Sequence, residues 1–284
     1  MTDWKTRQNG DGGWAYSFPR GETRGCSWTE PTAFVLLAQA ATTPDRESFL
    51  RGKQFLSSIA RGDGGCSPQP GVEESTWVTA LVALLPEEAV SVQQRRQAID
   101  WLKSRTGRES GWRNKLQQRL GGSKDEFPDG WPWFPGAAAW VIPTSLGILA
   151  FERALRRSDA SRDELQQRVD DGKKFLLSRM CADGGWNHGS NKALGRDGDS
   201  YPETTGIALL ALNGERSSAQ LERARAAARK HLADCRMAEG IAWLRMGLAA
   251  HGENSVTVAE PVCRTNLDAA LMTLAGVGKN PLLS

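Results

Sequence analysis

Residues 175–186, with the sequence FLLSRMCADGGW, predict the architecture of this chain. They join an aromatic–Leu pair to a glycine turn that ends in Trp. The same unit recurs at 55–66, where Cys66 stands in place of the Trp, and at 101–112, with the same spacing. Asp-Gly-Gly stands again at 11–13, followed by Trp14. A unit repeated in this way is typical of repeat architectures, in which each copy buries one face against its neighbours.

Each glycine turn is followed by a Thr that opens an almost wholly apolar helix. These four residues are Thr32, Thr76, Thr144 and Thr205. Amphipathic helices lie between them, as in 221–232, where apolar residues recur every three to four positions. Because an apolar helix must be covered all round and an amphipathic helix can face water, the alternation predicts an inner and an outer ring.

We therefore expect an all-α fold, an α/α toroid of about five to six helical hairpins, in a single domain covering residues 1–284. No alternating strand pattern and no Pro/Ser-rich linker interrupts it. The expected hairpins pair 29–42 with 45–59, 74–85 with 87–105, 142–157 with 162–180, 203–214 with 218–235 and, less regularly, 240–251 with 262–276.

The composition is that of a soluble globular protein, with 39% hydrophobic and 24% charged residues and a net charge of +3. The longest apolar stretches, 33–41 and 136–143, are too short to span a membrane, although peripheral contact with one stays open. The polar N-terminus and five separated cysteines favour a cytoplasmic location with reduced thiols. Arg is scattered rather than clustered, so no nucleic-acid partner is expected.

The aromatic–Leu pair, glycine turn and Trp resemble the QW repeat of squalene–hopene and oxidosqualene cyclases, which protein prenyltransferase β-subunits share more loosely. Residues 51–56 and 172–176 match the start of that motif, and 8–14 match its end; its Gln is absent from the other turns. The resemblance implies an α/α toroid with an apolar central cavity suited to an isoprenoid, without naming a reaction. We expect the turn residues Trp14, Trp112 and Trp186 to be structural.

Class II terpene cyclases protonate an alkene with the middle Asp of a DxDD motif, which is absent here. The resemblance leaves Asp199 and Asp129 as the candidate acids. Prenyltransferases of this kind hold zinc with Asp, Cys and His, but the spacing of Asp199, His188 and Cys263 matches no metal-ligand pattern. No metal and no cofactor is expected.

Three further acids, Glu30, Glu74 and Glu203, each stand two residues before an inner-helix Thr, which predicts a shared rim of the toroid. Carboxylates at helix N-termini are stabilised in the ionised form, so a capping role competes with a catalytic one. We also expect Tyr201, at the start of the same helix as Glu203, to face this rim.

The segment 127–140 is rich in aromatic residues and proline, and we expect it to belong to none of the repeats. Its rings, Trp131, Trp133 and Trp140, are candidates for the substrate pocket, where ring faces stabilise positive charge by about 1–2 kcal/mol. The alternative is that this segment plugs one end of the toroid.

Two functions follow from these observations. One is the binding or acid-initiated isomerisation or cyclisation of an isoprenoid, with Asp199 or Asp129 as proton donor. The other is a non-catalytic toroid that holds a lipid, another apolar small molecule or a partner protein, in keeping with the missing DxDD acid and zinc ligands. A partner protein that completes the site would reconcile the two.

Overall fold

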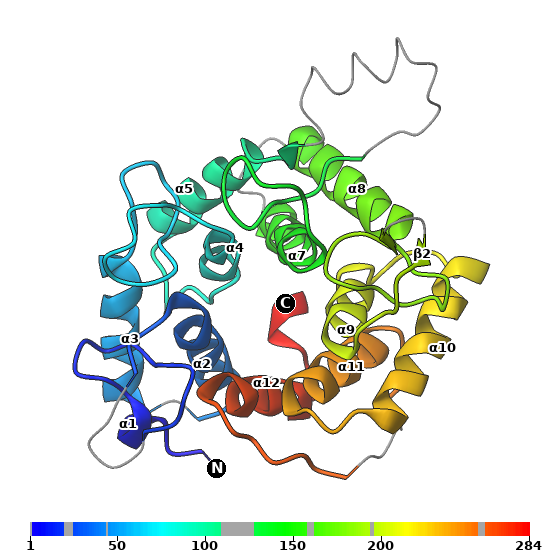
Figure 1. Cartoon of the computed structure of the whole chain (residues 1–284). Coiled ribbons are helices and arrows are strands. Elements are labelled where there is room, and N and C mark those ends of the chain that lie inside the picture. Colours follow the sequence, from blue (N-terminus) through cyan, green and yellow to red (C-terminus); the bar gives the residue numbers. More distant parts are fainter. Residues whose placement is uncertain are drawn as a thin grey trace.

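The chain forms a closed ring of helices, described here by a computed structural model for residues 2–19, 25–43, 45–108, 128–157, 162–193, 196–254 and 259–284. Figure 1 shows the helices of the inner ring around a common centre. They are α2 (Thr29–Ala41), α4 (Val78–Ala83), α7 (Val141–Arg157), α9 (Pro202–Ala211), α11 (Ala238–Ala250) and α12 (Asn266–Gly276). The ring closes because α12 packs against both α11 and α2. The all-α toroid is confirmed.

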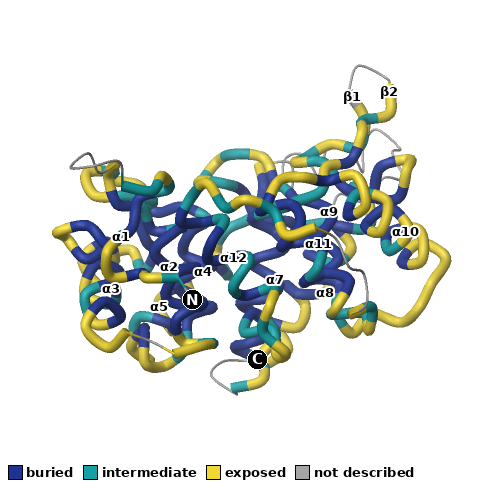
Figure 2. The backbone as a smooth tube through the Cα atoms, turned by 90° about the horizontal axis from the view of Figure 1, so that it is seen from below, coloured by how far each residue is buried: buried dark blue, intermediate teal, exposed yellow. Residues whose placement is uncertain are grey.

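Outer helices cover four of the inner ones. They are α3 (Arg46–Ser58) on α2, α5 (Val92–Lys103) on α4, α8 (Arg162–Ser178) on α7 and α10 (Ala219–Asp234) on α9. Three short elements complete the described chain: α1 (Trp4–Arg7), an antiparallel pair of strands β1 (Lys192–Ala193) and β2 (Arg196–Asp197), and the 3-10 helix η2 (Pro281–Leu283). Seen edge-on in Figure 2, the β1–β2 pair projects from one face of the ring and the C-terminal segment lies at the other. Within the described ranges, no helix is long and apolar enough to cross a membrane.

The expected hairpins differ from the structure at two places. The last expected pair is not an inner helix with an outer one, because α11 and α12 both belong to the inner ring and are apolar on most sides. The second outer helix begins only at Val92, because Ser91 caps it by accepting a hydrogen bond from the Gln94 N–H. Pro86 and a turn precede that cap, so α4 and α5 are both shorter than predicted.

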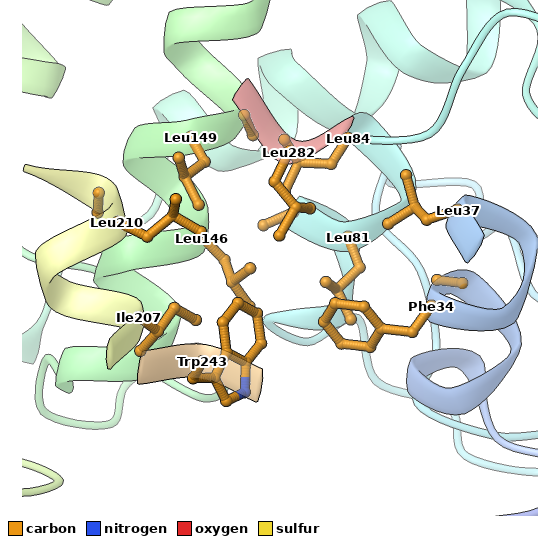
Figure 3. Close-up of a cluster of buried hydrophobic side chains, with 14 of the residues drawn as sticks. Phe34, Leu37, Leu81, Leu84, Leu146, Leu149, Ile207, Leu210, Trp243 and Leu282 are labelled. Carbon is orange, nitrogen blue, oxygen red and sulfur yellow. The ribbon is translucent and has the colours of Figure 1, made fainter. Parts of the chain in front are cut away.

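The centre of the ring is filled with side chains. Figure 3 shows labelled side chains from α2, from α4 and its C-cap, and from α7, α9 and α11 gathered at the centre, with Leu282 of η2 among them. They are Phe34, Leu37, Leu81, Leu84, Leu146, Leu149, Ile207, Leu210, Trp243 and Leu282. None is more than 5% exposed. A hollow that admits water would leave exposed surface on its walls, so the expected apolar central cavity is absent at this level of the described ring.

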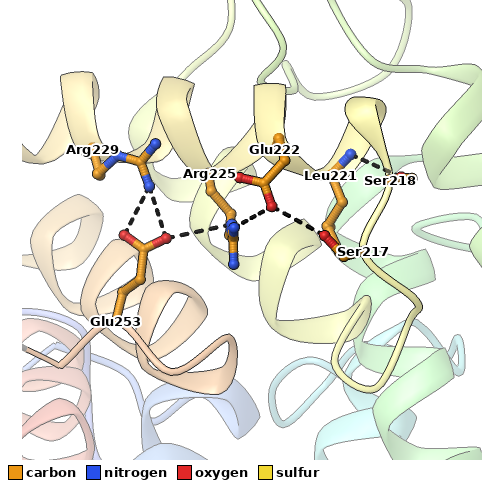
Figure 4. A network of polar contacts seen from close by, with 7 residues as sticks. All are labelled: Ser217, Ser218, Leu221, Glu222, Arg225, Arg229 and Glu253. Carbon is orange, nitrogen blue, oxygen red and sulfur yellow. Dashed lines mark hydrogen bonds and ion pairs between the residues drawn. The ribbon is translucent and has the colours of Figure 1, made fainter.

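A polar network fastens α10 to the segment that follows α11 (Figure 4). The Arg229 guanidinium donates to both oxygens of Glu253, at 2.8 and 2.9 Å, and Arg225 lies 3.4 Å from the same carboxylate. Arg225 also pairs with Glu222, which accepts a hydrogen bond from Ser217. These groups are partly exposed, so each pair contributes at most about 1 kcal/mol.

Candidate active site

Every repeat fastens its glycine turn to an inner helix in the same way. The backbone N–H after the last glycine donates to a Thr hydroxyl at 2.9–3.0 Å, in the pairs Trp14–Thr32, Cys66–Thr79, Trp131–Thr144 and Trp186–Thr205. The second repeat therefore uses Thr79 and not Thr76. The third turn ends in Trp131, whereas Trp112 lies outside the described residues. The expectation that segment 127–140 belongs to no repeat is thus wrong.

Trp131 occupies a structural position. It is 2% exposed, its indole N–H donates to the Leu102 carbonyl at 3.0 Å, and the Arg168 guanidinium lies 4.0 Å from its ring centroid. The indoles of Trp14 and Trp186 likewise donate to backbone carbonyls and are fully buried. The turn tryptophans therefore join the turn, the inner helix and a preceding helix, and Trp131 is not available to line an open pocket.

The structure places the predicted acids at different sites. Asp129 belongs to the turn before Trp131, and its backbone carbonyl accepts a hydrogen bond from Arg168 of the outer helix α8. Asp199 is exposed in the loop between β2 and α9, without a hydrogen bond or ion pair to a described residue. Glu74 is exposed ahead of α4, because the shift from Thr76 to Thr79 puts Trp77 at the rim position that Glu74 was expected to hold.

Three carboxyls meet at one end of the ring, which we call the mouth. Glu30, Glu203 and Glu239 are each the second residue of an inner helix, α2, α9 and α11 respectively. The charges of Glu30 and Glu203, together with that of Asp268 at the start of α12, act on the Glu239 carboxyl. The N-terminal ends of these four helices therefore lie at the same end of the ring. Sequence reasoning missed Glu239 because the residue two positions on is Ile241 rather than Thr.

Glu30 is a largely enclosed carboxyl of the mouth. Protein surrounds much of its side chain, which keeps some exposed surface. The Tyr16 hydroxyl donates a hydrogen bond to Glu30 Oε2. Burial raises the pKa of Glu30 to about 7, although the bond from Tyr16 acts in the opposite direction. A much larger fraction of this carboxyl is therefore protonated near neutral pH than of an ordinary glutamate.

Glu239 and Glu203 complete the acidic group. Burial raises the pKa of Glu239 to about 7, and the negative charges of Glu30, Glu203 and Asp268 add to that effect. Because Glu30 and Glu239 act on each other, the loss of a proton from one disfavours its loss from the other. Glu203 is partly exposed, and its Oε1 lies 3.7 Å from Nε2 of His188.

An arc of aromatic rings borders the mouth from the start of α4 to the start of α9. It consists of Trp77, Trp133, Trp140, His188 and Tyr201. Successive ring centroids along this aromatic arc lie 4.9, 6.4, 6.5 and 5.2 Å apart. All five side chains keep exposed surface. The predicted site residues Trp133, Trp140 and Tyr201 are thus brought together, and the arc gives the mouth one apolar side beside its carboxyls.

Ser200, Asp183 and His231 resemble a catalytic triad by composition only. Ser200 Oγ lies 2.7 Å from Asp183 Oδ2 and 2.6 Å from His231 Nε2. Since the hydroxyl donates its one proton to Asp183, His231 must donate to Ser200 and is not placed to act as its base. Ser27 and Ser75 make the same bond to the Asp of their own turns, so the arrangement belongs to the repeat.

The described residues contain no group of three His, Cys, Asp or Glu side chains arranged to hold a metal ion. The mouth therefore offers carboxyl groups, a histidine and aromatic rings as its chemistry. Such a set suits proton transfer to a polar ligand that also presents apolar faces.

Comparison with known proteins supports the fold and leaves the family open. No protein-family model matches the chain, and no curated protein sequence matches it. Among solved structures, the family 76 α-mannanase from Bacteroides thetaiotaomicron is 8% identical, with a TM-score of 0.59 over 89% of this chain and 86% of that one. A reducing-end-xylose releasing exo-oligoxylanase complexed with xylose is 12% identical, with a TM-score of 0.59 over 99% and 91%.

A type II terpene cyclase is also similar. MstE from Scytonema, in complex with its product merosterolic acid A, is 17% identical, with a TM-score of 0.54 over 95% of this chain and 74% of that one. Likeness at these identities shows the fold alone. The chain has the α/α-toroid fold that glycosidases and a terpene cyclase share.

Proposed function

We propose that this protein is an acid–base enzyme that cleaves a glycosidic bond at the mouth, with Glu30 as the proton donor. The observation that carries the proposal is Glu30, a largely enclosed carboxyl at the N-terminal end of α2 that is hydrogen-bonded by Tyr16 and whose pKa burial raises to about 7. A general acid works best when its pKa lies near the operating pH.

The other carboxyls supply the rest of the chemistry. Glycoside hydrolysis uses one carboxylic acid that protonates the leaving oxygen and one carboxylate that activates water or attacks the sugar. Glu30 gives its proton to the glycosidic oxygen, and Glu203, which is open to solvent, accepts a proton from the attacking water. Glu239 favours the protonated form of Glu30 whenever Glu239 itself is charged.

The aromatic arc supports a carbohydrate ligand. Sugar rings combine hydroxyl groups, which the carboxyls can hold, with C–H faces that pack on Trp77, Trp133 and Trp140. The filled centre of the ring favours a ligand that lies across the mouth over a long chain that enters it. Two of the structural neighbours are named as a mannanase and an oligoxylanase.

A second candidate is the acid-initiated isomerisation or cyclisation of an isoprenoid. The specific observation in its favour is that Glu30 contacts Tyr16, whose ring centroid lies 5.5 Å from that of Trp28, and aromatic ring faces stabilise positive charge. The fold also resembles that of a terpene cyclase. Given the filled centre, the substrate would lie in the mouth, with Glu30 in place of Asp199 or Asp129 as donor.

The test compares two substrate panels on one set of variants. Mannan-, xylan- and glucan-derived oligosaccharides are assayed for new reducing ends, and squalene and polyprenyl diphosphates for new hydrocarbon products. We expect sugar release that falls by about 10²–10⁴-fold in Glu30→Gln and stays unchanged in Glu74→Gln, an exposed acid of the same type.

Each other outcome has a definite meaning. Turnover of the isoprenoid panel with the same loss in Glu30→Gln would replace the first function with the second. Sugar release that persists in Glu30→Gln would contradict the assignment of the acid. Absence of turnover on both panels would refute both enzymatic functions. It would favour a non-catalytic toroid that binds a lipid, another apolar small molecule or a partner protein.

A further inference from the structure

The rim of the mouth is held by a backbone hydrogen bond that recurs around the ring. The first residue of an inner helix, or the residue before it, donates its N–H to the carbonyl two positions after the residue that ends a neighbouring glycine turn. Four such bonds, of 2.7–2.9 Å, join Thr29 to Pro68, Trp77 to Trp133, Val141 to His188 and Asn266 to Tyr16. A neighbouring helix therefore fixes Tyr16, Trp133 and His188 at the mouth.

The bond to Tyr16 is reinforced by a side chain. Asn266 is fully buried, and its Nδ2 donates to the Ala15 carbonyl at 2.9 Å and to the Ser17 carbonyl at 3.3 Å. Together with its backbone bond, Asn266 thus holds three consecutive carbonyls, with that of Tyr16 at the centre. At the equivalent junction of α2, the Thr29 hydroxyl donates to a single carbonyl.

The start of α12 holds Asn266 itself in place. Thr265 and Asp268 form a capping box, in which the Thr265 hydroxyl accepts from the Asp268 N–H at 2.9 Å and Asp268 Oδ2 accepts from the Thr265 N–H at 3.0 Å. Such a reciprocal pair fixes the first turn of a helix. Asn266 Oδ1 is buried and has no partner among the described residues, a cost that an apolar residue would avoid. The two donated bonds therefore account for an amide at this position.

The segment that Asn266 holds also carries the hydrogen bond to Glu30. The Tyr16 hydroxyl donates its one proton to Glu30 Oε2, so the carboxyl proton of Glu30 stands on Oε1. The ring of Tyr16 lies beside Trp28, with centroids 5.5 Å apart. Burial, the charge of Glu30 and the hydrogen bond to it, and the charge of Glu239 raise the pKa of the Tyr16 hydroxyl. Movement of this segment would therefore change both the orientation of the carboxyl and the surroundings of the phenol.

We propose that Asn266 is a positioning residue of the mouth, which holds the Tyr16 hydroxyl against Glu30 Oε2 and thereby keeps Oε1 as the oxygen that carries the proton. Because Asn266 has no exposed surface, it acts only through Tyr16. The placement of Tyr16 stands on these contacts alone, whereas the effect on turnover rests on the proposed function. Loss of such alignment lowers the rate of the chemical step rather than the affinity for substrate.

The ultraviolet absorbance of the phenolate tests the placement of Tyr16, because the chain has only two tyrosines. With Tyr201→Phe as the background, the signal after a rapid rise in pH comes from Tyr16 alone. We expect this hydroxyl to stay protonated above about pH 10, where an ordinary tyrosine ionises, and Asn266→Ala to move the midpoint back toward that value. Asn9→Ala is the matched control and should leave the midpoint unchanged, because buried Asn9 Nδ2 also donates two hydrogen bonds, neither of them to residues 15–17.

Turnover tests the consequence for the proton donor. On a sugar substrate that the wild type cleaves, Asn266→Ala should lower kcat by up to about 10²-fold with KM little changed, and Asn9→Ala should change neither. Asn266→Ser, which keeps one donor, should give smaller changes in both readouts and replaces Asn266→Ala if that variant does not fold. A wild type without turnover would refute the proposed function, and the phenol titration would still decide whether Asn266 positions Tyr16.

Three results would overturn the inference. These are a Tyr16 midpoint that does not move in a folded Asn266→Ala or Asn266→Ser variant, an equal shift of the midpoint in Asn9→Ala, and a kcat that keeps its wild-type value while the midpoint shifts.

Discussion

Replacement of Glu30 with Gln should remove a large part of the loss of stability that this protein suffers as the pH rises, while Glu239, whose pKa burial also raises to about 7, keeps its own contribution. Glutamine keeps the shape of the side chain, and its amide oxygen still accepts the hydrogen bond from Tyr16, but it cannot ionise. The substitution therefore isolates the cost of charging this largely enclosed carboxyl from the loss of a contact.

The direction follows from the pKa of Glu30, which burial raises from 4.5 to about 7. Between these two values the folded protein holds a proton that the unfolded chain has released. Stability therefore falls as the pH rises through this window, and the penalty is complete above about pH 7 and absent below pH 4.5. A shift of this size corresponds to about 3 kcal/mol as an order of magnitude.

The assay is thermal unfolding of wild type, Glu30→Gln and Glu74→Gln at pH 5, 7 and 9. For a chain of this length 1 kcal/mol corresponds to roughly 2 °C, so Glu30→Gln should exceed wild type by about 6 °C at pH 9 and match it near pH 5. Glu74→Gln, at an exposed carboxyl, should follow wild type throughout. Parallel curves for wild type and Glu30→Gln would refute the raised pKa and with it the reason for choosing Glu30 as the donor.

Three other perturbations follow from the same contacts. Gly184→Ala should lower the free energy of unfolding by well over 1 kcal/mol, because Gly184 has φ +97° and a Cβ there would lie 2.7 Å from a backbone oxygen of α10. The control Gly71→Ala should lower it by only about 1 kcal/mol, because Gly71 has φ +83° but open space around it. Equilibrium denaturation measures both values. Leu282→Ala should cost about 2–5 kcal/mol in the same assay, since it leaves a void in the filled centre of the ring. Tyr16→Phe removes a bond that favours ionised Glu30, so its Tm should fall further below wild type at pH 9 than at pH 5.

The fold could be predicted because the residues that define each repeat lie close together in the sequence. The Asp of each turn, its glycines and the following Trp lie within a few residues of one another, and each depends on backbone geometry that the sequence signals directly. The placement of both α11 and α12 in the inner ring could not be predicted in the same way. Both are apolar helices, and only the closing contact between α12 and α2 shows that the inner ring takes both.

The candidate site was predicted in part, for reasons that particular residues illustrate. Glu30 and Glu203 were found because a Thr follows each at a fixed distance, and Trp133 and Trp140 because aromatic residues stand out in a turn. Glu74 was misplaced because the second repeat has two candidate Thr residues, and the hydrogen bond from Cys66 selects Thr79. Glu239 lacks the Thr signal altogether, so only the converging helix ends place it at the mouth.

The position of Glu30 at a helix N-terminus sets two effects against each other. The helix dipole and the free N–H groups of the first turn favour a carboxylate there, typically by 0.3–1 kcal/mol and by about 2 kcal/mol at most. The raised pKa of Glu30 corresponds to a net effect of about 3 kcal/mol in the opposite sense, so burial is the larger contribution. Burial, rather than position in the repeat, is therefore what favours the protonated form of Glu30. The proposed role of Glu30 as a proton donor depends on this property.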